Sequence, residues 1–119
     1  MTTKEIADRL AELCRKGDFE KAQKDLYAED AISMEPHATP AFEKEIKGLK
    51  NILEKGEKFS SMVEKMNSMD VSDPIIADNS FAFTMTMDAV MKDMGPMKMT
   101  ELCIYEVKDG KVVKEQFVM

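Results

Sequence analysis

The spacing of hydrophobic residues changes once along this chain. In the first half, apolar residues recur every three or four positions, which is the spacing of one helical face. From about residue 60 they alternate with polar residues, as on a strand. Helices followed by long strands predict an α+β domain. The 119 residues leave room for one such domain with a single core.

Three helices are expected before the sheet. The first follows a threonine cap at the N-terminus and ends at Gly17, and Asp18 caps the second. Residues 31–35 alternate and predict a short strand, which a loop bounded by two prolines follows. A third helix is predicted over residues 41–59, where Gly48 would mark a close approach to the sheet or a break.

The second half of the chain predicts an antiparallel sheet. A strand over residues 60–76 is expected to bend at Pro74, and longer strands are expected over residues 81–91, 97–107 and 112–118. An Asp-Gly pair joins the last two strands and is typical of a tight hairpin turn. We therefore expect a curved sheet with the helices against one face.

Both faces of this sheet carry apolar residues. On the strand over residues 97–107, Cys103 and Tyr105 share one face, while Leu102 and Ile104 share the other. The helices can cover one face, but a chain of this length has nothing left to cover the second. We therefore expect a homodimer formed through the open sheet face.

Charge and hydropathy argue against two classes of partner. The net charge is −6, which repels phosphate backbones, so no nucleic-acid partner is expected. No apolar run approaches the roughly 20 residues of a membrane-spanning helix, and the N-terminus lacks the apolar segment of a signal peptide. We expect a cytoplasmic protein without a membrane partner.

Few residues could support metal or thiol chemistry. Cys14 and Cys103 lie far apart in the sequence, and His37 is the only histidine. This set lacks the spacing of a metal site, so neither a metal nor another cofactor is expected. Both thiols are expected to be small core residues.

Methionine is unusually frequent in this chain. There are 12 methionines, and ten of them lie between Met34 and Met99. The thioether side chain is flexible and polarizable, so it adapts to irregular apolar shapes. We expect most of them in core packing and at the dimer surface, and two or three in a pocket that accepts an apolar ligand.

Four segments occur in an order that is familiar from a known family. They are CRKGDF at 14–19, LYAEDA at 26–31, FTMTMD at 83–88 and the long segment YEVKDGKVVKEQF at 105–117. Together they span nearly the whole chain, which resembles the SnoaL-like branch of the nuclear transport factor 2-like superfamily. The resemblance implies one SnoaL-like domain over residues 1–119.

The fold implied by this resemblance is a cone-shaped barrel. Three N-terminal helices pack on a strongly curved antiparallel sheet, and a pocket opens at one end. Members of the superfamily include polyketide cyclases, ketosteroid isomerases, scytalone dehydratases and epoxide hydrolases, so the fold does not select one activity. Their common chemistry is proton transfer by a carboxylate in an apolar pocket, which raises the carboxyl pKa.

Three residues are candidates for this chemistry. Glu101 lies between apolar neighbours on its strand face, where a solvated glutamate fits poorly, and Glu115 lies similarly on the last strand. His37 follows the short first strand, although a loop histidine is more often an exposed polar residue. Counting from the Asp-Gly turn places Glu115 opposite Ile104. The His–Asp pair of SnoaL-like cyclases cannot be placed, because His37 is not on a strand.

A further set of residues is expected to contact the ligand. Its members are aromatic or thioether side chains near the expected opening: Tyr27, Met34, Phe42, Phe83, Met85, Met87, Met99 and Phe117. Asp88 would face away from this pocket if Met85 and Met87 face into it.

Two functions remain open at this stage. The first is a pocket that binds a small apolar molecule and catalyses isomerisation, cyclisation or hydrolysis through a carboxylate. The second is a non-catalytic ligand-binding or dimerisation module. The sequence does not decide whether the protein is an enzyme.

Overall fold

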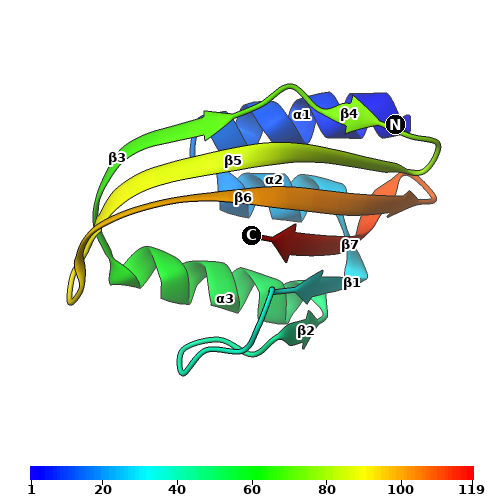
Figure 1. Ribbon diagram of the computed structural model, residues 1–119. Coiled ribbons are helices and arrows are strands. Elements are labelled where there is room, and N and C mark those ends of the chain that lie inside the picture. Colours follow the sequence, from blue (N-terminus) through cyan, green and yellow to red (C-terminus); the bar gives the residue numbers. More distant parts are fainter.

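One curved sheet and three helices on its concave side make up the molecule (Figure 1). The structure is a computed structural model that describes residues 1–119. The helices are α1 (Thr3–Arg15), α2 (Phe19–Leu26) and α3 (Leu49–Met62). The strands are β1 (Tyr27–Met34), β2 (Glu45–Lys47), β3 (Val63–Val71), β4 (Ile75–Ile76), β5 (Ser80–Met91), β6 (Gly95–Lys108) and β7 (Lys111–Val118).

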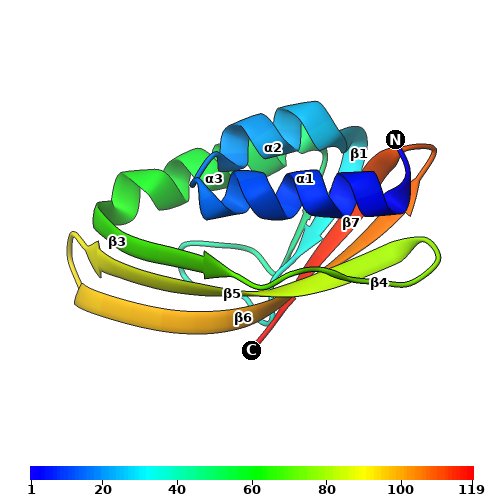
Figure 2. The ribbon, with the colours of Figure 1, turned by 90° about the horizontal axis from the view of Figure 1, so that it is seen from above.

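The first helix begins as its sequence predicts. The Thr2 hydroxyl accepts a hydrogen bond from the Glu5 amide at 3.1 Å, and the Glu5 carboxylate accepts one from the Thr2 amide at 2.9 Å. This reciprocal pair satisfies two amides that the helix itself leaves free. Gly17 ends the helix with a φ of 76°, so the chain turns at once into α2. Both helices then lie over the sheet (Figure 2).

The prediction of a helix over residues 41–59 was wrong in its first part. Gly48 has a φ of 92°, which no helical residue adopts, and α3 begins only after it. The Gly48 amide donates instead to the Ala31 carbonyl at 2.8 Å. Residues 45–47 form β2 against β1, so Phe42 lies on the connecting loop and not on a helix.

The sheet confirms the α+β class and departs from the expected topology at one pair. The strand order is β2-β1-β7-β6-β5-β3, with β4 paired to β5. All pairs are antiparallel except β1 and β7, which run parallel. The sheet is therefore mixed, and it stays open because β2 and β3 end it without pairing to each other. Its curvature is accompanied by irregular register within the β3–β5 and β6–β7 pairs.

Two apolar clusters lie on the concave side. The larger contains 16 buried residues from the three helices and the neighbouring strands, including Ile6, Leu10 and Phe83. The smaller contains Met87, Ala89 and Met91 near the turn of the β5–β6 hairpin, and its partly buried members include four further methionines and Phe59. None of the helices is long and apolar enough to cross a membrane.

The two glycines of the α3 region allow a matched test of backbone strain. Gly48→Ala places a side chain at a φ of 92°, so we expect it to lower the free energy of unfolding by roughly 1–3 kcal/mol. Gly56→Ala lies within α3 and meets only the Gln23 amide oxygen at 3.9 Å, so we expect it to raise stability by up to about 1 kcal/mol. Urea denaturation measures both values. Equal effects of the two substitutions would contradict this account.

The homodimer stays a prediction, and the convex face of the sheet is where it would form. Leu102 and Val118, which pair across β6 and β7, are 39% and 40% exposed there. We expect sedimentation equilibrium to give a dimer at micromolar concentration and Leu102→Glu to convert it to a monomer, because a charge would be buried in the interface. A wild-type monomer at that concentration would disprove the dimer.

Candidate functional site

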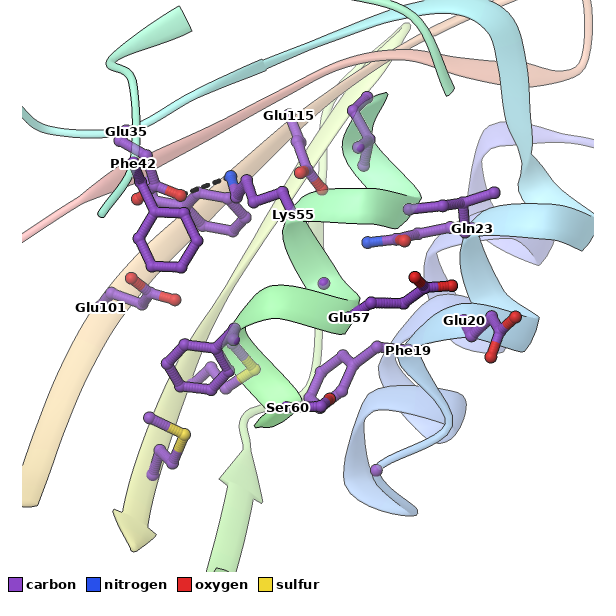
Figure 3. Close-up of a pocket in the computed structure, with 18 of the residues that line it drawn as sticks. Phe19, Glu20, Gln23, Glu35, Phe42, Lys55, Glu57, Ser60, Glu101 and Glu115 are labelled. Atoms are coloured by element: carbon purple, nitrogen blue, oxygen red, sulfur yellow. Dashed lines mark ion pairs between the residues drawn. The ribbon is translucent and has the colours of Figure 1, made fainter. Parts of the chain in front are cut away.

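A cavity of about 1210 Å³ opens around α3 (Figure 3). One part lies between α3 and the concave face of the sheet, and the other is a crevice between α3 and α2. The sheet contributes mostly methionine, phenylalanine and glutamate side chains: Met69, Met85, Met87, Met99, Glu101, Glu115 and Phe117. From α3 come Ile52, Leu53, Lys55, Gly56 and Phe59, and the loop after β1 adds Glu35, Pro36, His37, Thr39 and Phe42.

Glu101 is the carboxylate that faces this cavity without a protein partner. It lies in the middle of β6, opposite Met85 on β5, and is only 8% exposed. No hydrogen bond to its carboxylate contributes to its pKa. The Glu101 pKa is raised to about 7, chiefly by burial and also by the charges of Glu35 and Glu115, while the charge of Lys55 lowers it. Near neutral pH the side chain can therefore both accept and release a proton.

Glu115 is also buried, but both of its carboxylate oxygens accept hydrogen bonds from the protein. It is 3% exposed, and its carboxylate accepts a hydrogen bond from the Tyr27 hydroxyl. Its other oxygen accepts one from the Ser33 hydroxyl at 2.6 Å. Burial raises the Glu115 pKa, while these two hydrogen bonds lower it. The residue therefore joins β1 to β7 beneath the cavity and has little capacity left for a ligand.

A β-bulge explains why Glu115 faces inward at all. The predicted register placed it opposite Ile104, on the convex face, but the structure pairs it with Tyr105 on the concave face. The register shifts between Glu106 and Val107, where β7 contains one extra residue. A one-residue shift moves a side chain to the other face of a sheet, so this bulge brings Glu115 inside.

Lys55 is the one lysine whose ammonium lies among these carboxylates. Its Nζ pairs with the Glu35 carboxylate at 2.5 Å and donates to the Ser33 hydroxyl at 2.9 Å. The same Nζ lies 5.2 Å from the centre of the Phe117 ring, and the side chain is 14% exposed. An ammonium has three donors, so two are used here and the third is free to meet a ligand.

Sequence reasoning missed both members of this ion pair. Lys55 resembles any lysine of a surface helix, but it lies three residues after Ile52 and four before Phe59, on the face that lines the cavity. That spacing is the signal that could have found it. Glu35 had no signal of its own, because its role depends on where the loop after β1 meets α3.

The cavity holds more negative than positive groups. On the side next to the sheet, Glu35, Glu101 and Glu115 lie near one ammonium, that of Lys55. Like charges in a region of low dielectric disfavour full ionisation, so a proton is held more readily here than in water. Glu101 is the member with no hydrogen bond to stabilise its charge, and it is therefore the natural holder of that proton.

The structure brings together most of the residues predicted for the site, and three lie elsewhere. Glu101, Glu115 and His37 line the cavity, as do Phe42, Met85, Met87, Met99 and Phe117. Tyr27 lies below it with its hydroxyl on Glu115, and Phe83 packs in the main core against Tyr105. Met34 follows the inward-facing Ser33 and therefore points to the convex side.

The remaining candidates fall outside the chemistry of the cavity. His37 is exposed on the loop at the rim. Asp88 accepts a hydrogen bond from Asn67 at 3.2 Å and lies on the face opposite Met87. Burial raises the pKa of the Cys14 thiol to about 12, so it carries no thiolate at neutral pH. No cluster of three or more His, Cys, Asp or Glu side chains is arranged to hold a metal ion.

Comparisons with known proteins agree with this architecture. A protein from Mesorhizobium loti, provisionally described as a SnoaL-like polyketide cyclase, matches with a TM-score of 0.92 at 28% identity over 100% of both chains. A Xanthomonas campestris protein of unknown function with a cystatin-like fold matches with a TM-score of 0.83 at 17% identity, over 98% of this chain and 89% of that one.

A third solved structure is IdmH from Streptomyces antibioticus, provisionally described as a polyketide cyclase. It matches with a TM-score of 0.75 at 19% identity, over 99% of this chain and 91% of that one. The likeness to this protein and to the Xanthomonas protein shows the fold alone. Among curated proteins, none matches the chain.

The family is settled by a match over the full length. The family model for the SnoaL-like domain matches residues 1–119, which confirms the resemblance carried by the four sequence segments. This chain belongs to the SnoaL-like domain family.

Proposed function

We propose that the protein binds a small, largely apolar molecule with a carbonyl group and catalyses proton transfer on it, with Glu101 as general base. The observation that carries the proposal is the unpartnered carboxylate of Glu101 in a cavity lined by methionine and phenylalanine. A general base works best when its pKa lies near the working pH, and the Glu101 pKa of about 7 meets this condition.

The direction of the proton transfer follows from the surroundings of Glu101. Removing a proton from the carbon next to a carbonyl leaves an enolate, whose negative charge collects on oxygen. Glu101 takes that proton and becomes neutral, which an apolar cavity favours. In an isomerisation it returns the proton to another carbon, and in a cyclisation the enolate carbon attacks a second carbonyl of the same molecule.

Lys55 supplies the group that the developing enolate needs. Two of its three N–H groups are held by Glu35 and Ser33, which fix the ammonium beside Phe117. The third can donate to an oxygen that gains negative charge in the transition state. Because Lys55 is already positioned by the protein, little reorganisation is needed when the charge forms.

Glu115 and His37 are less suited to act as the base. The Glu115 carboxylate is occupied by Tyr27 and Ser33, so taking a proton from a ligand would require breaking those bonds. His37 is exposed at the rim, where water competes for its nitrogen atoms. Cyclisation is supported by the Mesorhizobium loti neighbour, which is provisionally described as a SnoaL-like polyketide cyclase.

A non-catalytic ligand-binding protein is the second candidate. It is favoured by the size of the cavity, about 1210 Å³, and by its flexible methionine walls, which accommodate ligands of different shape. The two candidates differ in one measurable respect, which is whether the bound molecule loses a proton to Glu101.

The ring opening of 5-nitrobenzisoxazole tests the base directly. A base removes the carbon-bound proton of this apolar molecule, the N–O bond breaks, and a coloured phenolate is released. We expect the protein to accelerate the reaction, with a rate that rises with pH through about 7, and Glu101→Gln to lower the rate roughly a hundredfold.

The matched control for this assay is Glu106→Gln, an exposed residue of the same strand on the other face, which should leave the rate unchanged. Full activity in Glu101→Gln would exclude Glu101 as the base. Binding of the neutral fluorescent dye N-phenyl-1-naphthylamine without any acceleration would favour the second candidate.

The raised pKa of Glu101 also predicts how stability depends on pH. Between its ordinary pKa of 4.5 and its folded value of about 7, the folded protein holds a proton that the unfolded chain has lost. Stability from this group is therefore lost as pH rises through that window. At about pH 8 we expect Glu101→Gln to be more stable than the wild type by roughly 1–3 kcal/mol, and at about pH 4 to be equal to it.

Urea denaturation across this pH range measures the difference, and Glu106→Gln again provides the control. A ¹³C NMR titration of the Glu101 carboxyl gives the pKa itself. A midpoint near 4.5, together with no stability gain at high pH, would show that the carboxylate is solvated and would remove the basis of the proposed chemistry.

A further inference from the structure

We propose that residues 35–44 form a lid over the cavity, that Lys55 and Lys58 of α3 hold it closed, and that Phe42 is the lid residue that contacts the ligand. The proposal rests on the proposed function, because it assumes that a ligand occupies the cavity beneath this segment. It adds a step to that function, since a ligand can reach Glu101 from this side only when the lid has moved.

The segment is joined to the rest of the molecule mainly at its base. At the base, the Glu35 amide donates to the Lys44 carbonyl at 2.7 Å. At the tip, the Thr39 amide donates to the Phe42 carbonyl at 2.8 Å, and the Phe42 amide donates to the Thr39 hydroxyl at 3.0 Å. The tip is thus closed on itself, and none of these backbone bonds ties it to the helix or the sheet. It can move as a unit about its base.

Side chains of α3 supply the contacts that hold the tip down. Lys58 Nζ donates to the Ala41 carbonyl and lies 5.3 Å from the centre of the Phe42 ring. One turn earlier, Lys55 pairs with Glu35 at the base of the segment. Lysines three residues apart share one face of a helix, so both contacts act on the same side of the lid. Lys58 thus supplies the hydrogen bond and the cation–π contact that join the tip to α3.

The tip covers the part of the cavity that contains the base. Phe42 and Glu101 both line the cavity, and in Figure 3 the Phe42 ring lies between Glu101 and the Glu35–Lys55 ion pair. An aromatic ring in this place separates the carboxylate from solvent, which preserves the apolar surroundings that a carboxylate base requires. The ring also limits the height of any ligand above Glu101, so its size should affect which ligands fit.

A lid and a simple contact residue can be told apart by kinetics. Removing a contact that exists only in the complex raises the dissociation rate alone. Removing the group that holds a lid closed raises the association and dissociation rates together, because both pass through the open state. The affinity then changes less than either rate.

Stopped-flow binding of N-phenyl-1-naphthylamine to the full chain tests this distinction. We expect Lys58→Met, which keeps the apolar stem but removes the charge, to raise both rate constants about fivefold to tenfold. Lys50→Met, an exposed residue of the same helix, is the matched control and should leave both rates unchanged. An increase in the dissociation rate alone, or no change in either rate, would overturn the lid.

A second measurement uses the absence of tryptophan from this chain. Phe42→Trp introduces a single indole at the lid, and acrylamide quenching reports how open it is. We expect Lys58→Met in this background to increase quenching about twofold or more, and bound dye to reduce it. Equal quenching with and without the Lys58 change would also overturn the proposal. If the wild type binds no dye at all, the proposed ligand-binding function fails, and the quenching comparison still tests the lid.

Discussion

The hydrogen bonds that the buried Glu115 carboxylate accepts hold the site together. They reach both ends of β1, at Tyr27 and Ser33, and so fix the parallel pairing of β1 with β7. The Ser33 hydroxyl in turn accepts a hydrogen bond from the Lys55 ammonium of α3. A buried carboxylate without these partners would be strongly unfavourable, so β1, β7 and α3 are positioned together. The loop after β1 and the floor of the cavity depend on this arrangement.

The same network explains why two glutamates in similar sequence surroundings differ in their chemistry. Glu115 has its charge stabilised by donors, whereas Glu101 has burial and nearby carboxylates but no donor. Glu101 therefore still holds a proton near neutral pH, which is the property that the proposed proton transfer uses. Methionine side chains around Glu101 keep the cavity apolar while leaving its shape adjustable. The lower stability expected at high pH follows from keeping this carboxylate in an apolar cavity, and perturbed pKa values of this kind cluster at functional sites.

The correction to the third helix has the largest functional consequence. A helix over residues 41–59 would have placed Phe42 on a rigid element packed against the sheet. The positive φ of Gly48 delays the helix, and the residues before it form β2 and the loop that the two lysines of α3 contact. Helical spacing alone could not reveal this, because Phe42 and Ile46 fit a helical face as well as they fit a loop and a short strand.

Local patterns determined much of this protein by themselves. Periodicity gave the helices of the first half and the long strands of the second, turn residues gave the hairpins, and four segments in order gave the family. Glu101 could also be predicted from the sequence, because a charged residue between apolar neighbours on one strand face is a local anomaly. Tertiary structure decided the rest: the parallel β1–β7 pair, the bulge that turns Glu115 inward, and the meeting of Lys55 with Glu35. These features join residues that are distant in sequence. The contacts that stabilise them form only when the elements pack together, so no local pattern records them.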